Sequence, residues 1–160
     1  MTVRIRRADR SDAKTLLRLV CALADYEKLD RPTAEAQTRL MRDGWPSVGE
    51  PRFQSWLAEA ADANGAVEAV GYAITFFTYS SFLARRTLYI EDIFILPERR
   101  REGIGTALFD ALVVEAQAQG CGRMEWVVLD WNTSAQQFYQ NLGAAHLEDW
   151  QYYRLPIDSE

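Results

Sequence analysis

The sequence predicts an α/β protein with one domain. Its 160 residues match the length of a single domain, and 48% hydrophobic with 26% charged residues is typical of a folded chain. Hydrophobic periodicity switches between the strand and helix periods, giving the order β-α-α-β-β-β-α-β-α-β. Strands and helices alternate in the second half, as in parallel strands joined by helical crossovers. These observations predict one domain over residues 1–160, with a mixed sheet and flanking helices.

The first half contains one strand, two helices and a hairpin. Alternating residues at 3–6 predict a short strand, and apolar residues at helical spacing follow a Ser11 cap over residues 11–29. A second, shorter helix starts at Pro32-Thr33 and ends near Asp43-Gly44. Apolar runs at 53–60 and 66–78 flank an Asp-Ala-Asn-Gly segment, which predicts a β-hairpin.

The second half alternates strands and helices. Residues 87–95 and 124–129 read as buried strands, and the amphipathic segment 103–119 between them reads as a helix closed by Gly120. A helix over 133–143 follows, capped by Asn132 or Thr133, and 144–155 read as one or two final strands. Right-handed crossovers make the strands at 87–95 and 124–129 parallel neighbours. Ligands of such sheets bind beyond the carboxyl ends of the strands.

Composition excludes several classes of chemistry. His146 is the single histidine, so a zinc site built on paired histidines is not expected, and we predict no metal. No Gly-x-Ser-x-Gly turn or phosphate loop of the Gly-x4-Gly-Lys type occurs. A net charge of −5 and a pI near 5.0 disfavour nucleic acid and mildly favour a small cationic substrate, although solubility alone also accounts for them.

The sequence also carries expectations about location. No apolar run reaches the roughly 18 residues of a membrane helix, and the basic N-terminus is not followed by a signal-peptide core. Cys21 and Cys121 fit reduced thiols. We therefore expect a cytoplasmic protein without a membrane partner.

A glycine-rich turn follows the strand at 87–95. Arg100-Arg101-Glu102-Gly103-Ile104-Gly105 opens the next helix, where glycines let the backbone approach a ligand and free N–H groups point outward. With the three consecutive arginines 99–101, this pattern describes a pyrophosphate cradle. The alternative is a solvated basic turn whose glycines serve packing, because short glycine motifs often match by chance.

Two acids lie within that same strand. Alternation places Glu91 and Asp92 on opposite faces of the sheet. Acids are depleted from strand interiors, and a carboxylate there is costly unless paired, hydrated or used. We interpret them as candidates for a functional site, the alternative being a paired or bulge-associated acid.

A polar segment begins the last predicted helix. Asn132-Thr133-Ser134 caps it, and Phe138 has the spacing of a core residue. Tyr139 points elsewhere, so its phenol is a candidate proton donor, although a packing tyrosine is the commoner use of such a residue.

In combination, these motifs resemble the GNAT superfamily of N-acetyltransferases. Arg100-x-x-Gly103-x-Gly105 matches its pyrophosphate motif, and the element order fits along nearly the whole chain. The resemblance implies the GNAT fold, a mixed sheet of six to seven strands with parallel, splayed central strands. Several segments are similar to the spermidine/spermine and thialysine/diamine branch, namely 19–27, Phe76–Tyr79, Leu88–Asp92, Leu129–Asn132, Phe138-Tyr139 and Leu142–Ala144.

The resemblance also implies roles for individual residues. Glu91 matches a base that works through water, and Tyr139 matches the acid that protonates the departing thiolate. Acetyl-CoA is the implied co-substrate, with no metal and a homodimeric assembly. The implied acetyl-CoA contacts are Ile93, Phe94, Ile95, Arg100, Arg101, Glu102, Gly103, Ile104, Gly105, Thr106, Asn132, Ser134, Ala135 and Tyr139. The implied amine contacts are Tyr26, Glu27, Glu91, Glu125, Trp126 and Val127.

One departure narrows the expected substrate. The polyamine branch carries an aspartate just after the tyrosine that matches Tyr79, whereas Ser80 stands here, as in the thialysine/diamine relative. The sequence therefore predicts acetyl transfer to a small diamine or lysine-like amine by direct attack in a ternary complex. The alternatives are a polyamine acceptor, a peptide N-terminus, or a CoA-binding module without catalysis. The segment 143–150 is shorter than in the polyamine branch, which leaves open whether Glu148 or Asp149 lines the amine site.

Overall fold

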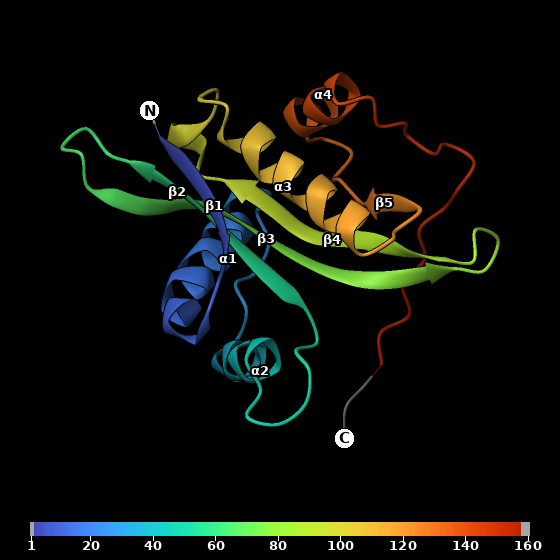
Figure 1. Ribbon diagram of the computed structural model, residues 1–160, viewed down its shortest axis with the longest axis horizontal. Coiled ribbons are helices and arrows are strands. Elements are labelled where there is room, and N and C mark those ends of the chain that lie inside the picture. Colours follow the sequence, from blue (N-terminus) through green and yellow to red (C-terminus); the bar gives the residue numbers. More distant parts are fainter. Residues whose placement is uncertain (1, 158–160) are drawn as a thin grey trace. The chain divides into compact units, whose positions relative to one another are not determined.

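A five-stranded mixed sheet organises the first part of the chain (Figure 1). The computed structural model describes residues 2–157, and contacts divide the chain into two compact units, Met1–Val127 and Val128–Glu160. The strands lie in chain order, antiparallel except for the parallel pair formed by the last two. They are β1 (Val3–Arg7), β2 (Gln54–Ala61), β3 (Val67–Ser80), β4 (Arg85–Ile95) and β5 (Arg123–Trp126).

Three α-helices complete the first unit, and a fourth belongs to the second. α1 (Ala13–Glu27) follows the 3-10 turn η1 (Arg10–Asp12), and α2 (Ala34–Gly44) begins directly after Thr33, within one residue of the predicted start at Pro32-Thr33. The 3-10 turn η2 (Pro97–Arg99) follows β4, α3 (Ile104–Ala118) links β4 to β5, and α4 (Thr133–Asn141) lies in the second unit. The predicted parallel crossover between β4 and β5 is therefore confirmed.

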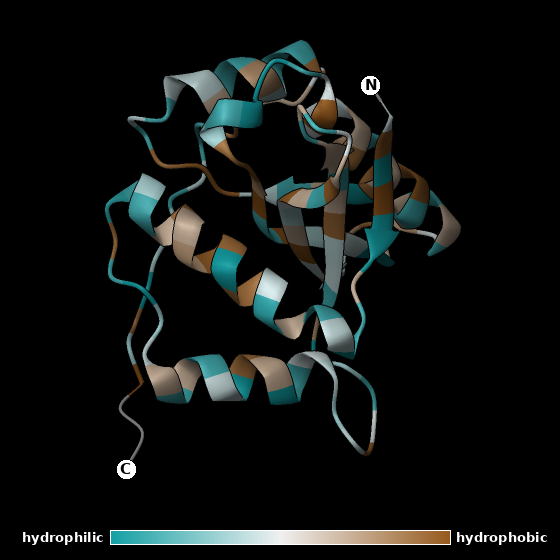
Figure 2. Ribbon diagram, turned by 90° about the vertical axis from the view of Figure 1, so that its left-hand side faces the viewer, coloured by the Kyte–Doolittle hydropathy of each residue, from teal (hydrophilic) through white to brown (hydrophobic). Residues whose placement is uncertain are grey.

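The helix ends differ in detail from the predictions. Asp9 takes the place predicted for Ser11 as the cap, because its carboxylate accepts the Ser11 N–H and thereby starts η1 ahead of α1. α1 ends at Lys28, which adopts a left-handed conformation with φ 59°. The helix ribbons in Figure 2 alternate between hydrophobic and hydrophilic residues, as expected for helices that pack one side on a sheet.

The two faces of the sheet carry separate cores. Leu16 and Leu19 of α1 pack with Tyr72 and Phe94 on one face, and all four are buried. α3 packs against β1, β3, β4 and β5, and its buried residues include Leu108 and Leu112. Figure 1 shows α1 and α3 on opposite sides of the sheet. This arrangement holds β4 between two packed layers and fixes the strand that carries the acidic pair.

Pairing between β4 and β5 is short. The register runs from Thr87 opposite Arg123 to Ile90 opposite Trp126, and β4 then continues for five more residues without a β5 partner. The splay predicted for the central strands is confirmed in this form. The edge of β4 beyond Ile90 is thereby left open toward the β5 side.

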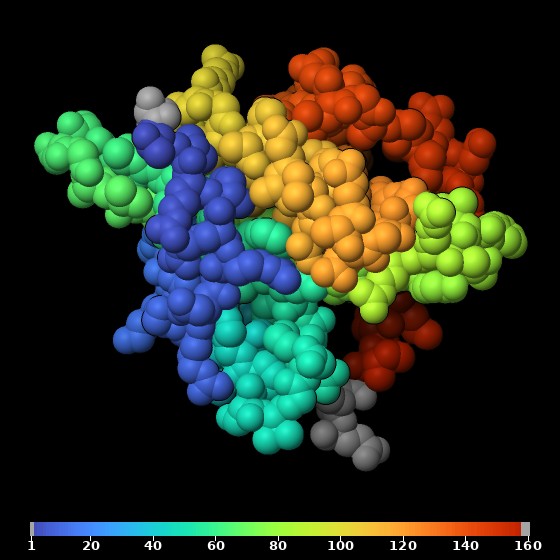
Figure 3. Space-filling model, in the orientation of Figure 1, coloured from blue at the N-terminus to red at the C-terminus, as the bar shows by residue number. Residues whose placement is uncertain are grey.

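The connection between β3 and β4 projects from this unit (Figure 3). Phe82 at its tip is 99% exposed. Ser80 ends β3 and is buried, and its hydroxyl accepts the Leu83 N–H at 3.1 Å. Ser80 is therefore occupied in shaping the turn.

The prediction of six to seven strands is wrong for the described residues. β5 ends at Trp126 instead of residue 129, and residues 144–157 form no strand. Trp150, Tyr152 and Tyr153 in this segment are strongly exposed. Aromatic content favours a strand only where a neighbour supplies hydrogen bonds, which local sequence cannot provide. The expectation of one domain over residues 1–160 stays a prediction.

Candidate active site

A β-bulge in β4 sets the position of the acidic pair. Thr75 lies opposite Ile90 and Ile74 opposite Asp92, so Glu91 is the extra residue. Ile90 and Ile93 face Thr75 and Ala73, which occupy the same face of β3. Two residues, Glu91 and Asp92, thus separate Ile90 from Ile93 on one face of the strand, where strict alternation allows only one. The predicted opposite orientation of Glu91 and Asp92 is therefore wrong. Glu91 is exposed and follows directly after the last residue of β4 that pairs with β5.

Asp92 is held from the neighbouring strand. The hydroxyl of Tyr72 donates to Asp92 Oδ2 at 3.0 Å, and Tyr72 itself is fully buried. Burial raises the pKa of Asp92 from 3.8 to about 6, an effect that the Tyr72 hydrogen bond opposes and that the charges of Glu91 and Glu27 reinforce. Burial also raises the pKa of Tyr72 well above its usual value, so the phenol keeps its proton and acts as a donor.

The backbone beyond the bulge faces two ways. Leu96 N–H donates to Val70 O at 2.9 Å, which makes Leu96 and Val70 a hydrogen-bonded pair of the antiparallel ladder. Because such pairs alternate, Ile93 and Ile95 turn their N–H and C=O groups away from β3, toward the edge that β5 leaves open. Phe94 turns its backbone toward β3 and buries its ring in the core. Of the three predicted cofactor contacts on β4, two thus have backbone groups aimed at the open edge.

The end of α1 contributes an aromatic residue and an acid. The ring of Tyr26 lies 5.8 Å from that of Phe94, centroid to centroid. The guanidinium of Arg100 stacks on Tyr26, with Cζ 4.3 Å from the ring centroid. Glu27 is partly buried, and burial raises the pKa of its carboxyl. The structure thus brings Tyr26 and Glu27 to the side of β4 that carries Asp92.

The three arginines after β4 serve different purposes. Arg99 pairs with Glu68 at 3.0 Å and with Glu102 at 3.1 Å, and it also donates to Ala61 O. Arg100 donates to Ile95 O at 3.1 Å in addition to stacking on Tyr26. Arg99 and Arg100 thus also make contacts within the fold, and the prediction that all three arginines add positive charge to a phosphate cradle stays a prediction. Arg101 is exposed and adopts a left-handed conformation with φ 65°.

The N-terminus of α3 fits a diphosphate. Gly103 caps the helix with φ 80°, and a Cβ built there would meet nothing within 4 Å. Ala107 N–H donates to Gly103 O in the first turn, so the N–H groups of Ile104, Gly105 and Thr106 precede the first helical bond. Open space, outward N–H groups and the helix dipole together suit an anion beside Arg101.

β5 places the remaining predicted amine contacts of the first unit. Glu125 pairs with Arg123 at 2.6 Å, and Trp126 packs edge-on against Phe109 of α3. Val127 follows the strand and is exposed. Trp126 is the partner of Ile90 and thus ends the pairing just before Glu91.

The second unit holds the other predicted residues. Asn132 caps α4, and its side-chain oxygen accepts the Ala135 N–H at 3.2 Å. Gln136 donates to Leu129 O and Asp130 O, so it fixes the loop before α4. Ser134 and Tyr139 lie on α4, and the Tyr139 ring packs edge-on against Phe138. Glu148 and Asp149 line a hollow of about 280 Å³ with His146 and Trp150.

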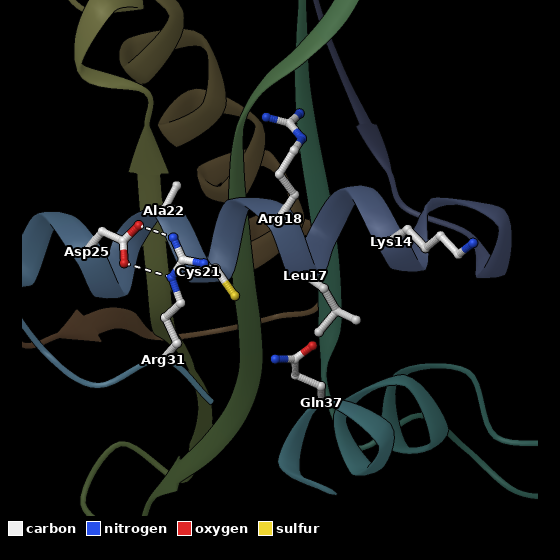
Figure 4. A pocket seen from close by; sticks show the side chains of 8 residues that line it. All are labelled: Lys14, Leu17, Arg18, Cys21, Ala22, Asp25, Arg31 and Gln37. Atoms are coloured by element: carbon white, nitrogen blue, oxygen red, sulfur yellow. Dashed lines mark hydrogen bonds and ion pairs between the residues drawn. The ribbon is translucent and has the colours of Figure 1, made fainter. Parts of the chain in front are cut away.

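A separate hollow of about 510 Å³ lies along the outer side of α1 (Figure 4). Figure 4 shows Arg31 facing Asp25, with Lys14 and Arg18 farther along the helix. This lining contains three cations and one carboxylate, which does not suit a cationic amine. It contains none of the residues predicted for acetyl-CoA or the amine. Among residues 2–157, no group of three or more His, Cys, Asp or Glu side chains could hold a metal ion, and no helix in that range is long and apolar enough to cross a membrane.

Sequence reasoning missed two contacts. The acids at 91 and 92 stood out as misplaced in a strand, but nothing local identifies Tyr72 as the partner of Asp92, because the two are 20 residues apart. The stacking of Arg100 on Tyr26 is equally non-local. An unusual acid inside an apolar strand was the only available signal for the first contact.

Comparisons with known proteins agree with the geometry. The model of the acetyltransferase (GNAT) family matches residues 19–144. A thialysine N-epsilon-acetyltransferase of Bos taurus is 35% identical over 159 residues, covering 96% of this chain and 92% of the relative. A spermidine/spermine N(1)-acetyltransferase-like protein of Homo sapiens is 30% identical, covering 94% of this chain and 22% of its own length. A crystal structure of a probable acetyltransferase superposes with a TM-score of 0.78 at 20% identity, covering 98% of this chain and 99% of that one.

Proposed function

This chain belongs to the GNAT family of acetyltransferases, and from that premise we propose that it acetylates the terminal amine of a small diamine or lysine-like molecule of the thialysine type. The coarser assignment is an acetyl-CoA-dependent N-acetyltransferase of the thialysine and spermidine/spermine branch. The finer proposal concerns the acceptor and the residues that activate it.

The observation that carries the proposal is the acidic group around the bulge of β4. Glu91 stands where β4 and β5 part, Asp92 follows it, and Glu27 is close enough to raise the pKa of Asp92. Three carboxylates on one side of a strand attract an ammonium group. An alkyl ammonium has a pKa near ~10.4 and arrives protonated, so an acidic site that also removes a proton suits it.

Glu91 is proposed to receive the ammonium proton through an ordered water. Acetyl-CoA, when bound, supplies the thioester, and the neutral amine then attacks its carbonyl carbon directly. The Ile93 N–H, which faces the open edge of β4, would stabilise the developing oxyanion. Gly103 to Thr106 and Arg101 would hold the pyrophosphate through backbone N–H groups and one guanidinium. Each positioned acid or base contributes on the order of 10²–10⁴ in rate.

The roles of residues in the second unit are proposed from the resemblance to the family. Tyr139 is proposed as the proton donor to the departing thiolate, and Asn132, Ser134 and Ala135 as further acetyl-CoA contacts. Asn132 already uses its side-chain oxygen to cap α4, which leaves its amide N–H₂ group as the donor for that role. A homodimer and a cytoplasmic location remain proposals of the same kind.

Ser80 favours a short acceptor over a polyamine. At this position, where the polyamine branch carries an aspartate, the hydroxyl is buried and bound to the Leu83 N–H. It therefore offers no charge to a second or third cationic nitrogen. A polyamine acceptor is the alternative, favoured by the spermidine/spermine-like relative.

The test is thiol release from acetyl-CoA with thialysine, lysine, putrescine, spermidine or no amine. We expect turnover with thialysine, lysine or short diamines, whereas faster turnover of spermidine would favour the polyamine alternative. Silence across the panel while acetyl-CoA binds would reject a small amine in favour of a peptide acceptor or a non-catalytic module.

Two variants test the assigned roles. Glu91→Gln should lower turnover by about 10²-fold or more near neutral pH and by less at high pH, where free amine is abundant. A loss independent of pH would reject the role of Glu91 as a base. Tyr139→Phe should lower turnover and leave acetyl-CoA affinity within a few-fold, and a collapse of that affinity would instead make Tyr139 a structural residue.

A further inference from the structure

The Tyr72–Asp92 pair is a buried polar contact that packing alone does not require. Tyr72 is fully buried among apolar residues of the α1 face, and its hydroxyl is directed to Asp92 Oδ2 at 3.0 Å. A buried phenol needs a hydrogen-bond partner, yet a neutral acceptor would meet that need at lower cost than a carboxylate, and a phenylalanine in place of Tyr72 would need no partner at all. The hydrogen bond therefore holds a carboxylate at a buried position, where its loss of hydration costs free energy.

The groups that face this pair are mostly acidic. Glu27 of α1 and Glu91 of β4 both act on Asp92, and Glu27 and Cys21 of α1 act on Tyr72. Arg100, the cation stacked on Tyr26 and Phe94, donates to the Ile95 carbonyl and not to a carboxylate. The phenol of Tyr72 is thus the donor that fixes the rotamer of Asp92 while leaving the charge of the carboxylate uncompensated.

We propose that Asp92, positioned by the Tyr72 hydroxyl, is the final acceptor of the ammonium proton, and that the exposed Glu91 draws the ammonium in and relays the proton. This inference rests on the proposed acetylation of a small amine. It makes Tyr72 a positioning residue and separates the roles of the two adjacent acids. The bulge makes the relay geometrically direct, because it places Glu91 and Asp92 on one side of β4.

The proton count closes for this assignment. The R–NH₃⁺ group gives one proton through Glu91 to the Asp92 carboxylate and becomes R–NH₂. Its nitrogen forms a C–N bond to the thioester carbonyl carbon while the C–S bond breaks, and the second nitrogen proton ends on the thiol of CoA. Asp92 then releases its proton to water, so the products are the amide, the thiol and one proton.

The pKa of Asp92 suits a group that accepts a proton near neutral pH. The pKa of Asp92 lies near 6, closer to neutrality than the ordinary value of 3.8, and a base works best when its pKa is near the operating pH. The Tyr72 hydrogen bond favours the charged form, so the bond keeps most of the carboxyl ionised at pH 7 despite its burial.

The experiment measures kcat/KM for the amine between pH 5 and 9 in the wild type and in variants of the pair, of Glu91 and of two control positions. Asp92→Asn and Tyr72→Phe test the pair, and Glu91→Gln tests the relay. Asp110→Asn on the exposed side of α3 and Tyr79→Phe, at a residue that is 67% exposed, are matched controls. Acetyl-CoA affinity and the thermal midpoint are measured for every variant. The substitutions keep side-chain size, and the amide oxygen introduced by Asp92→Asn can still accept the hydrogen bond from Tyr72.

We expect the wild type and both controls to show an acid limb that bends near pH 6. Asp92→Asn should lose about 10²-fold or more of kcat/KM together with the bend. Tyr72→Phe should move the bend to higher pH, because the bond that favours the charged carboxylate is gone, while acetyl-CoA affinity stays within about three-fold of the wild type.

The opposite pattern would overturn the inference. If Glu91→Gln removes the bend while Asp92→Asn and Tyr72→Phe keep it, Glu91 is the final acceptor and the buried pair is structural. If Tyr72→Phe lowers the rate at all pH values without moving the bend, Tyr72 does not tune Asp92. Failure of the proposed function looks different, since the wild type itself would then acetylate no small amine.

Discussion

Replacing the Asp92 carboxylate changes how stability depends on pH, and the magnitude follows from its surroundings. Burial raises the pKa of Asp92 from 3.8 to about 6 in the folded protein. The folded state therefore binds the proton more tightly than the unfolded state. The stabilisation from this proton is fully present below pH 4 and is lost as the pH rises through 6. The pKa difference corresponds to on the order of 3 kcal/mol of unfolding free energy.

Asp92→Asn removes this dependence and keeps an acceptor for the Tyr72 hydroxyl. The difference in unfolding free energy between Asp92→Asn and the wild type should therefore shift by about 2–3 kcal/mol in favour of the variant between pH 4 and pH 7.5. Urea unfolding at a series of pH values measures it. Titrating groups that do not interact with Asp92 cancel in the difference, among them Asp12, whose pKa Arg6 lowers.

Asp110→Asn on the exposed side of α3 is the control and should give a flat difference. A flat difference for Asp92→Asn as well would refute the reasoning. It would mean that the carboxyl of Asp92 is as well solvated in the folded protein as in the unfolded chain.

Three further variants concern Gly71 of β3, which lies opposite Ile95, and the two arginines at positions 100 and 101. A Cβ at Gly71 would lie 2.3 Å from Ile95 Cδ1 and 2.8 Å from Phe94 O. Gly71→Ala should therefore lower the free energy of unfolding in urea by about 1–3 kcal/mol and weaken acetyl-CoA binding. Unchanged stability would show that β4 can shift to make room for the methyl group. Arg100→Met should raise KM for the amine by about ten-fold or more and leave acetyl-CoA affinity within about three-fold, because its guanidinium holds Tyr26 and the Ile95 carbonyl. Arg101→Ala should weaken acetyl-CoA binding and leave KM for the amine nearly unchanged, since that side chain is exposed beside the start of α3. Equal effects of the two arginine variants on both quantities would contradict these separate roles.

The sequence predicted the helix start and the hairpin turn, which depend on residues close together in the chain. α2 starts where the sequence predicts, with Thr33 as its cap, and the hairpin of β2 and β3 closes on Asp62, whose carboxylate accepts the Asn64 and Ala66 N–H groups. The parallel pairing of β4 and β5 also followed, because a helix that joins two apolar strands leaves few topologies.

Contacts between residues far apart in the sequence were not predicted. The aromatic residues at 150–153 have strand composition, yet the described chain offers this segment no ladder. The arginines at 99–101 looked alike in sequence, but Glu68, 31 residues away, draws Arg99 into an ion pair. The bulge at Glu91 inserts one residue against the period of two, so an alternation argument fails there.

The bulge explains why both acids and the Ile93 N–H of β4 are available for the proposed chemistry, whereas the Ile95 carbonyl already accepts a hydrogen bond from Arg100. Without an extra residue, strict alternation would send Glu91 and Asp92 to opposite faces, and only one acid could serve an amine. With it, both acids lie on one side, and the ladder resumes so that Ile93 and Ile95 aim their N–H and C=O groups at the open edge. β5 stops pairing at Trp126, before these groups would be covered. A deletion that removes Glu91 would leave Ile90 opposite Thr75 and Asp92 opposite Ile74 in an unbroken ladder, so it should lose activity as Glu91→Gln does while keeping the Tyr72–Asp92 contact.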